Sequence, residues 1–358
     1  MEQLNLTISP RFILLGLSTD PQLKVVFFLI FLMMYLMTIS GNLLLITVVR
    51  INPALHSPMY FFLTNLAIID ISFSSSVVPV LLRNTLAEDR SISFLGCATQ
   101  MYVSLTLGGT ECILLAVMAY DRFAAICRPL HYNTIMNKTL CFYLAVGSLS
   151  VQLIDSILQV SLTLQLPFCN CLNINNYFCE IPAFLRMSCG DTIVNVLFVY
   201  LIGGIFIMCA FFLILISYAH IIFSILKMAS SQGRQKSFST CASHLTVVSL
   251  YYGTLMSMYL QPHSKKNCHY SNETDKVLPI LYAAVIPMLN PFIYSVRNKD
   301  VKSTLINLLK SPHNDLCSKI PLSQRQCVCD PITKFGMRPY CRSKEESRAR
   351  QTKLRQNT

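Results

Sequence analysis

The chain has 358 residues, of which 53% are hydrophobic and only 13% are charged, and its formal net charge is +12. Soluble domains carry roughly 25% charged residues, because charge keeps their surfaces in water. The composition therefore excludes an ordinary soluble enzyme or cytosolic binding module, and it predicts a protein that crosses a membrane several times.

The positive charge is unevenly distributed. The last 48 residues hold ten basic and four acidic side chains, which is half of the net charge. A strongly basic chain can be a nucleic-acid binder, but the apolar body of this one is only mildly basic. The distribution therefore argues against a nucleic-acid partner.

Seven apolar stretches have about the length that a helix needs to cross a hydrocarbon core of about 30 Å. Backbone groups inside lipid must bond within their own segment, so helices are expected and not strands. The sixth stretch is the weakest by hydropathy, and it has a polar start from Lys236. The stretches are Val25–Val49, Met59–Leu82, Met101–Ile126, Leu140–Leu164, Ile193–Leu226, Leu245–Leu260 and Val277–Val296.

The distribution of Lys and Arg favours an N-terminus outside the cell. With that orientation the inner segments carry eleven basic residues before the tail, and the outer segments carry eight. Asn5 begins an Asn-Leu-Thr sequon, which predicts glycosylation in a short outer N-terminus. Residues 1–20 lack the pattern of a signal peptide, so the first helix is expected to direct insertion.

Fifteen cysteines fall into two groups. Those within apolar stretches, such as Cys112, are expected to be small buried side chains. Those in the outer segments face an oxidising compartment, which favours disulfides. With Cys268 included, at most three bridges could form on that side, and spacing leaves their connectivity open.

Two acids lie at membrane depth, Asp70 in the second stretch and Glu111 in the third, with Asn290 in the seventh. Neighbouring carboxylates repel unless one is protonated or a cation lies between them. Two alternatives therefore stand, a monovalent cation site and a pair of protonated acids bonded to adjacent helices. The sequence offers no partner for a third acid, Asp155 in the fourth stretch.

Several short motifs stand in a fixed order along the chain. Residues 55–63 read LHSPMYFFL, residues 118–127 read MAYDRFAAIC, residues 217–218 read SY, residues 236–245 read KSFSTCASHL, and residues 287–295 read PMLNPFIYS. Together they resemble the signatures of odorant receptors, which are rhodopsin-like G protein-coupled receptors, and within that family they resemble the tetrapod-type branch. The resemblance covers residues 5–310.

This resemblance implies an all-α membrane protein, a seven-transmembrane helix bundle that is not an enzyme. Such a receptor binds small volatile or apolar odorants in a transmembrane cavity. It activates a heterotrimeric stimulatory olfactory-type G protein and raises cAMP. The implied location is the plasma membrane of sensory neuron cilia, with the N-terminus extracellular.

The resemblance also assigns roles to individual residues. Asp121 and Arg122 match a pair that is locked at rest, and Arg122 is expected to meet Tyr218 and the G protein on activation. Asn290, Pro291 and Tyr294 match a switch in the seventh helix, where an internal proline kinks the backbone. Asp70, Glu111 and Asn290 match residues that hold a structural sodium ion, and no other cofactor is expected. The implied disulfides are Cys97–Cys179 and Cys169–Cys189, and the implied cavity residues are Ser104, Leu105, Gly108, Gly109, Cys112, Tyr252, Tyr259 and Ala283.

The expected organisation is an extracellular N-terminus (1–24), a transmembrane domain (25–296), an amphipathic cytoplasmic helix (297–310) and a basic, disordered cytoplasmic tail (311–358). The tail is longer than the family pattern. Three interpretations compete: a silent disordered segment, a segment held at anionic membrane lipids by its basic residues, and an aberrant extension.

Other membrane proteins fit less well. An opsin needs a lysine in the seventh helix, and residues 277–296 contain none. A typical amine receptor has an acid where Ser104 stands. A transporter, the alternative from another class, would favour repeated halves with interrupted helices, and an enzyme would need a nucleophile and base at convincing spacing. None of these patterns is present in the sequence.

Overall fold

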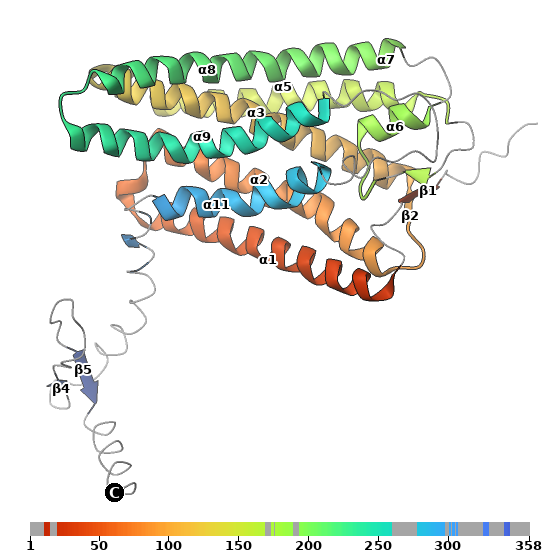
Figure 1. Ribbon diagram of the computed structural model, residues 1–358, viewed down its shortest axis with the longest axis horizontal. Coiled ribbons are helices and arrows are strands. Elements are labelled where there is room, and N and C mark those ends of the chain that lie inside the picture. The colour runs from red at the N-terminus through yellow and green to blue at the C-terminus, as the bar shows by residue number, and fades with distance from the viewer. Residues whose placement is uncertain are drawn as a thin grey trace, which may run out of the picture. The chain divides into compact units, whose positions relative to one another are not determined.

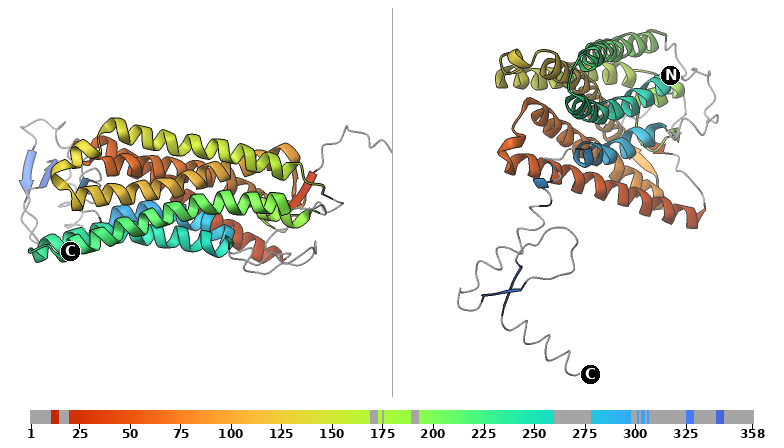
Figure 2. Two further views of the ribbon diagram at one scale, coloured as in Figure 1. Left: turned by 90° about the horizontal axis from the view of Figure 1, so that it is seen from above. Right: turned by 60° about the vertical axis from the view of Figure 1, so that its left-hand side comes forward.

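The structure is a computed structural model, and it describes residues 11–14, 20–168, 173–174, 176–188, 193–259, 278–297, 301, 303–304, 306, 325–328 and 340–343. Residues 1–299 and 300–358 form two separate compact units. In the first unit, long helices lie side by side and run along a common direction (Figures 1 and 2). This is the predicted helical bundle.

Within the described residues, six segments are long and apolar enough to cross a membrane. They are α1 (Pro21–Ile51), α2 (Pro58–Leu86), α3 (Phe94–Cys127), α5 (Lys138–Leu164), the run Val196–Leu226 and the run Leu278–Ser295. The fifth run joins α7 (Ile193–Phe198), a π turn (Val199–Gly203) and α8 (Gly204–Leu226). The last one joins a π turn (Leu281–Val285) to α11 (Ile286–Arg297).

The seventh long helix of the bundle is α9 (Ser231–Tyr259), which contacts α3, α8 and α11. Polar residues in its first turns keep it below the hydropathy of a membrane span, as the sequence predicted. Large apolar side chains such as Leu36 on α1 and Phe223 on α8 point outward. An apolar exterior of this extent suits lipid and not water.

Local capping explains where several helices begin. The Asp20 side chain accepts a hydrogen bond from Gln22 N at the start of α1, and the Ser93 hydroxyl accepts one from Gly96 N at the start of α3. Asn137 caps α5 in the same way. These side chains satisfy backbone donors that the first helical turn leaves without partners.

Short strands close the bundle at the end where α3 begins (Figure 1). β1 (Arg11–Leu14) pairs antiparallel with β2 (Ser91–Ser93) and parallel with β3 (Asn173–Ile174). Phe12 of β1 is fully buried against Phe184 of α6 (Ile181–Met187). The prediction of an all-α chain did not include this sheet.

At the opposite end of α3, two short 3₁₀ helices and one short α-helix form the connections. The 3₁₀ helices are Pro53–Leu55 and Pro129–His131, and the α-helix is α4 (Tyr132–Ile135). In the second unit, β4 (Arg325–Val328) pairs antiparallel with β5 (Tyr340–Ser343). Most residues of the predicted amphipathic helix and tail lie outside the described residues.

Candidate functional site

A cavity of about 150 Å³ lies beside the first half of α3. Most of its wall is apolar, with contributions from α2, α6, α8, α9 and the π turn before α11. α5 supplies the polar side chains Gln152, Asp155 and Gln159. The size and composition suit a small, mostly apolar organic molecule.

The predicted cavity residues of α3 all line this space: Ser104, Leu105, Gly108, Gly109 and Cys112. Both glycines are needed for close packing. A Cβ atom at Gly108 would collide with the Tyr282 hydroxyl, and one at Gly109 would collide with the Gln152 side-chain amide. The absence of side chains here lets neighbouring elements approach α3.

Tyr252 does not line the cavity, contrary to the prediction. Its hydroxyl donates to the Cys112 carbonyl at 3.0 Å and lies 3.1 Å from Cys112 Sγ. The cavity is lined instead by Tyr251, Leu255 and Met258, which share one helix face at i, i+4 and i+7. Packing therefore rotates α9 one residue away from the predicted face.

Two other predicted cavity residues have different outcomes. Ala283 is not in the cavity wall, and it is buried in an apolar cluster with Val77 and Val78. The Ala283 carbonyl accepts a hydrogen bond from the Ser74 hydroxyl at 3.4 Å. The backbone of Tyr259 ends α9, but its side chain lies outside the described residues.

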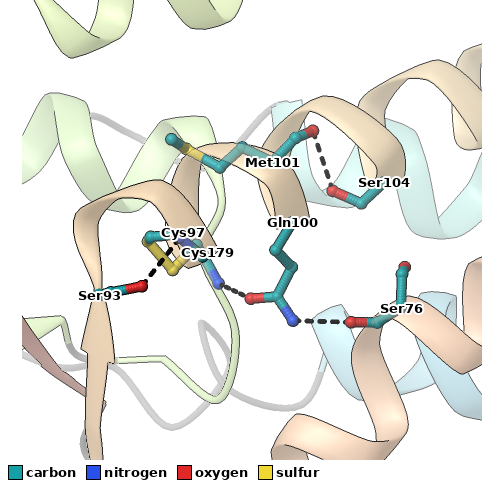
Figure 3. The surroundings of a disulfide bond; sticks show 8 residues. Ser76, Ser93, Cys97, Gln100, Met101, Ser104 and Cys179 are labelled. Carbon is teal, nitrogen blue, oxygen red and sulfur yellow. Dashed lines mark hydrogen bonds between the residues drawn. A yellow bond between two sulfur atoms is a disulfide. The ribbon is translucent and has the colours of Figure 1, made fainter.

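The predicted disulfide between Cys97 and Cys179 is present (Figure 3). Gln100, one turn along α3, supports it with two hydrogen bonds. Its Oε1 accepts from Cys179 N at 2.9 Å, and its Nε2 donates to the Ser76 carbonyl at 2.9 Å (Figure 3). The bridge and Gln100 thus tie the segment before α6 to α2 and α3. The predicted Cys169–Cys189 bridge and the Asn5 sequon lie outside the described residues.

The two acids at membrane depth meet at Asn290. Its Nδ2 donates to both carboxylate oxygens of Asp70, at 3.1 and 3.0 Å, and lies 3.4 Å from Glu111 Oε1. All three side chains are at most 2% exposed. In the part of the chain that the structure describes, the Asn290 Oδ1 and the Asn42 Oδ1 are buried without a hydrogen-bond partner. Helices α2, α3 and α11 therefore bring side-chain oxygen atoms together around Asn290.

At the far end of α3, Asp121 is held from two sides. Arg122 Nη2 contacts its Oδ2 at 2.6 Å, and the Tyr132 hydroxyl of α4 donates to its Oδ1 at 2.7 Å. Asp121 is fully buried. This arrangement keeps Arg122 turned toward its neighbour in the chain.

Tyr218 of α8 has a different partner from the one predicted for activation. Its hydroxyl lies 2.7 Å from His244 Nδ1 of α9, and the two rings stack with centroids 5.8 Å apart. Pro291 of α11 packs against α1, where a Cβ atom on Gly41 would lie 3.0 Å from the Pro291 Cγ. Tyr294 is buried, and its hydroxyl has no hydrogen-bond partner among the described residues.

Comparison with known proteins decides the family. A sequence model described as olfactory receptor matches residues 31–311. Olfactory receptor 5AR1 of Mus musculus is 44% identical over 309 residues, covering 86% of this chain and 98% of that protein. The chain belongs to the olfactory receptor family.

Two further relatives agree. Olfactory receptor 5AP2 of Mus musculus is 46% identical, over 85% of this chain and 95% of that protein. Olfactory receptor 2B2 of Homo sapiens is 45% identical, over 86% and 85% respectively. Membership of this family makes the protein a multi-pass receptor of the plasma membrane and not an enzyme. The family implies an odorant ligand and coupling to a G protein.

Sequence reasoning missed three groups at the functional sites of this olfactory receptor. Tyr132 on Asp121 and His244 on Tyr218 are contacts between different elements, 11 and 26 residues apart in the chain. Asp155 was noticed as an acid at membrane depth, but its place in the cavity wall was not predicted. The spacing from Asp155 to Gln159 on one helix face was the available signal.

Proposed function

We propose that this receptor binds a small odorant in the cavity between α3, α5 and α9, activates a heterotrimeric stimulatory olfactory-type G protein, and thereby raises cAMP. The observation that carries the proposal is a cavity of about 150 Å³ with a largely apolar wall. Burial of apolar surface contributes roughly 25 cal/mol per Å², so a molecule that fits this space would bind with modest affinity.

The proposed switch is the pair of contacts that hold Arg122 and Tyr218 apart. Arg122 is bound by Asp121, and Tyr218 is bound by His244. Both contacts must break before Arg122 can meet Tyr218 and the G protein. We take the described arrangement as the resting state, whose population a ligand shifts only through different affinity for the two states.

Helix α9 provides a direct connection between cavity and switch. Tyr251 lines the cavity, and His244 lies two helical turns before it on the same helix. A ligand that moves Tyr251 would displace His244 and release Tyr218. This motion belongs to the helix shifts that many switching proteins use.

The proposed orientation places the N-terminus outside, with the receptor in the plasma membrane of sensory neuron cilia. The Cys97–Cys179 disulfide supports this orientation, because oxidising compartments preserve disulfides. Cys97 lies in the first turn of α3, directly after β2, which pairs with β1. Arg122 and α4 lie at the other end, where the G protein would bind.

We further propose that Asp70, Glu111 and Asn290 hold a sodium ion. Their donor chemistry fits, because hard cations prefer oxygen ligands and the Asn290 Oδ1 is buried with no partner among the described side chains and backbone. The ion would neutralise negative charge between α2 and α3. Asn290 then orients both carboxylates through its amide nitrogen.

The experiment measures cAMP in cells that carry the receptor and the olfactory-type G protein, against a broad odorant panel. A dose-dependent response that Arg122→Ala removes, at equal surface display, is the expected result. Odorant uptake without cAMP would instead favour a transporter. A second chain that stops after Lys310 runs in parallel, and a response only in that form would identify residues 311–358 as inhibitory.

A further inference from the structure

The cavity has a polar wall that apolar odorant burial does not explain. Asp155 of α5 and Glu180, which precedes α6, both line the cavity, and Asp155 is only 8% exposed. No Lys, Arg or His is among the described residues that line it. The described part of the cavity wall therefore holds two acids and no side-chain cation.

Gln159 places a second acceptor beside the Asp155 carboxylate. Its Nε2 donates to Asp155 Oδ2 at 2.7 Å. A carboxylate can only accept hydrogen bonds, so this contact sets the direction of the amide. The Gln159 Oε1 is left buried with no hydrogen-bond partner among the described residues, and the whole side chain is 1% exposed. A buried acceptor without a partner at a cavity wall indicates a missing donor.

The Ser104 hydroxyl, another polar group of the cavity wall, does not supply a donor to the Gln159 Oε1 or to Asp155. The Ser104 hydroxyl donates to the Met101 carbonyl at 3.1 Å, so its oxygen remains free to accept. In the part of the chain that the structure describes, the ion pair of Arg122 and Asp121 is the only one. Asp155 thus has no side-chain countercharge there, an unfavourable state for a carboxylate at membrane depth.

We propose that this receptor recognises small aliphatic amines, whose protonated amino group binds the Asp155 carboxylate and the Gln159 Oε1. An ammonium group offers three donors and no acceptor, which matches this wall. An alcohol of the same skeleton offers one donor and no charge. The hydrocarbon part occupies the apolar remainder of the cavity beside Leu105 and Leu255.

The acid for amine recognition then comes from α5, whereas Ser104 occupies the position on α3 where an acid would be typical of amine receptors. Both residues line the same cavity. The inference rests on the proposed function, because it names the ligand class of that same cavity. It goes further in predicting charge selectivity, which an apolar cavity alone would not show.

The test compares matched probes, cyclohexylamine with cyclohexanol and isopentylamine with isopentyl alcohol. Two readouts run on the full-length receptor: the thermal unfolding midpoint of purified protein, and cAMP in cells. In the unsubstituted receptor we expect at least one amine to raise the midpoint and to act at a concentration at least tenfold lower than its alcohol. Asp155→Asn should abolish this preference at equal surface display, because it removes the charge and keeps the size.

Glu180→Gln is the matched control, since it removes the other acid of the cavity. Glu180→Gln should keep the amine preference. If Glu180→Gln loses the preference and Asp155→Asn keeps it, the assignment to Asp155 is overturned. Equal effects of amine and alcohol, or no midpoint shift with any amine, would also overturn the inference. Suppose that amines raise the unfolding midpoint in a way that Asp155→Asn removes while cAMP stays unchanged. That result would support the amine site and contradict the proposed signalling. A cAMP response to alcohols alone would support the proposed signalling and contradict the amine site.

Discussion

Tyr132 and Arg122 bind opposite oxygens of one carboxylate, that of Asp121. The Tyr132 hydroxyl lies on α4, outside the membrane-spanning helices, and it donates at 2.7 Å. Burial raises the pKa of the Tyr132 hydroxyl, and the charge of Asp121 raises it further. Tyr132 therefore stays protonated at neutral pH and acts as a permanent donor to the resting lock.

Tyr132→Phe is expected to raise cAMP in the absence of ligand. The change leaves one Asp121 oxygen without its donor, and a hydrogen bond to a charged group contributes about 1.5–3 kcal/mol. Every 1.4 kcal/mol changes an equilibrium constant about tenfold. Losing part of this hydrogen-bond energy from the resting state should therefore raise basal signalling several-fold. Tyr143→Phe is the control, because Tyr143 is 66% exposed on α5. Equal basal cAMP in both variants would contradict this role of Tyr132.

Tyr251 and Tyr252 are neighbours with different expected roles. The Tyr251 hydroxyl donates to the Gly108 carbonyl within the cavity wall, so Tyr251→Phe should shift the odorant EC50 by about tenfold. Tyr252 does not line the cavity, and its hydroxyl donates to the backbone carbonyl of Cys112, which does. Tyr252→Phe should therefore lower the free energy of unfolding by about 1 kcal/mol, with little change in EC50. The reverse pattern in dose–response and thermal unfolding would show that the predicted face of α9 is the functional one.

Gly108→Ala is expected to weaken the odorant response at least tenfold. Its new methyl group collides with the Tyr282 hydroxyl, and Tyr282 is packed against Phe73 and Tyr251. Overpacking of this kind typically costs about 1–3 kcal/mol. Gly147→Ala is the matched control, because nothing lies within 4 Å of a Cβ atom there. Dose–response curves at equal surface display test the prediction, and unchanged potency in Gly108→Ala would contradict the packing argument.

Sodium is expected to raise the thermal unfolding midpoint of the purified receptor relative to choline at equal ionic strength. An ion that binds the folded state alone stabilises it by mass action. Asp70→Asn should remove this difference, because it deletes one of the two carboxylates that Asn290 joins. Asp89→Asn is the control, since Asp89 is an acid outside the membrane-spanning helices that bonds the Ser91 backbone. A sodium effect that survives Asp70→Asn would assign the ion to another place.

Cys97→Ser is expected to abolish most surface display. Loss of a native disulfide typically costs about 2–5 kcal/mol, and here it frees the segment before α6. Gln100→Leu should cause a smaller loss, because it removes the two hydrogen bonds that connect Cys179 and Ser76 to α3. Cys209→Ser, at an exposed free cysteine, is the control. Flow cytometry of intact cells measures the order of the three variants.

Apolar length and the short motifs were sufficient to predict the family, the helical bundle and the Cys97–Cys179 disulfide. These features depend on local composition and on residue patterns that are legible along the chain. The sheet of β1, β2 and β3 was not predictable in the same way. Its strands have two to four residues each, which is too few for a periodic signal.

The rotation of each helix was decided by tertiary packing. Tyr251 and Tyr252 differ by one position in sequence, and only the contacts of α9 with α3 and α8 determine which of them lines the cavity. Packing also decided the place of Asp155. From the sequence it was an acid at membrane depth for which no partner could be named. Contact with Gln159 and a place in the cavity wall turn it into a candidate ligand anchor. The sequence by itself thus determined which helices form and to which family they belong. Only the packing of those helices decided which side chains meet, because residues far apart in the chain come together through side-chain fit that no local pattern encodes.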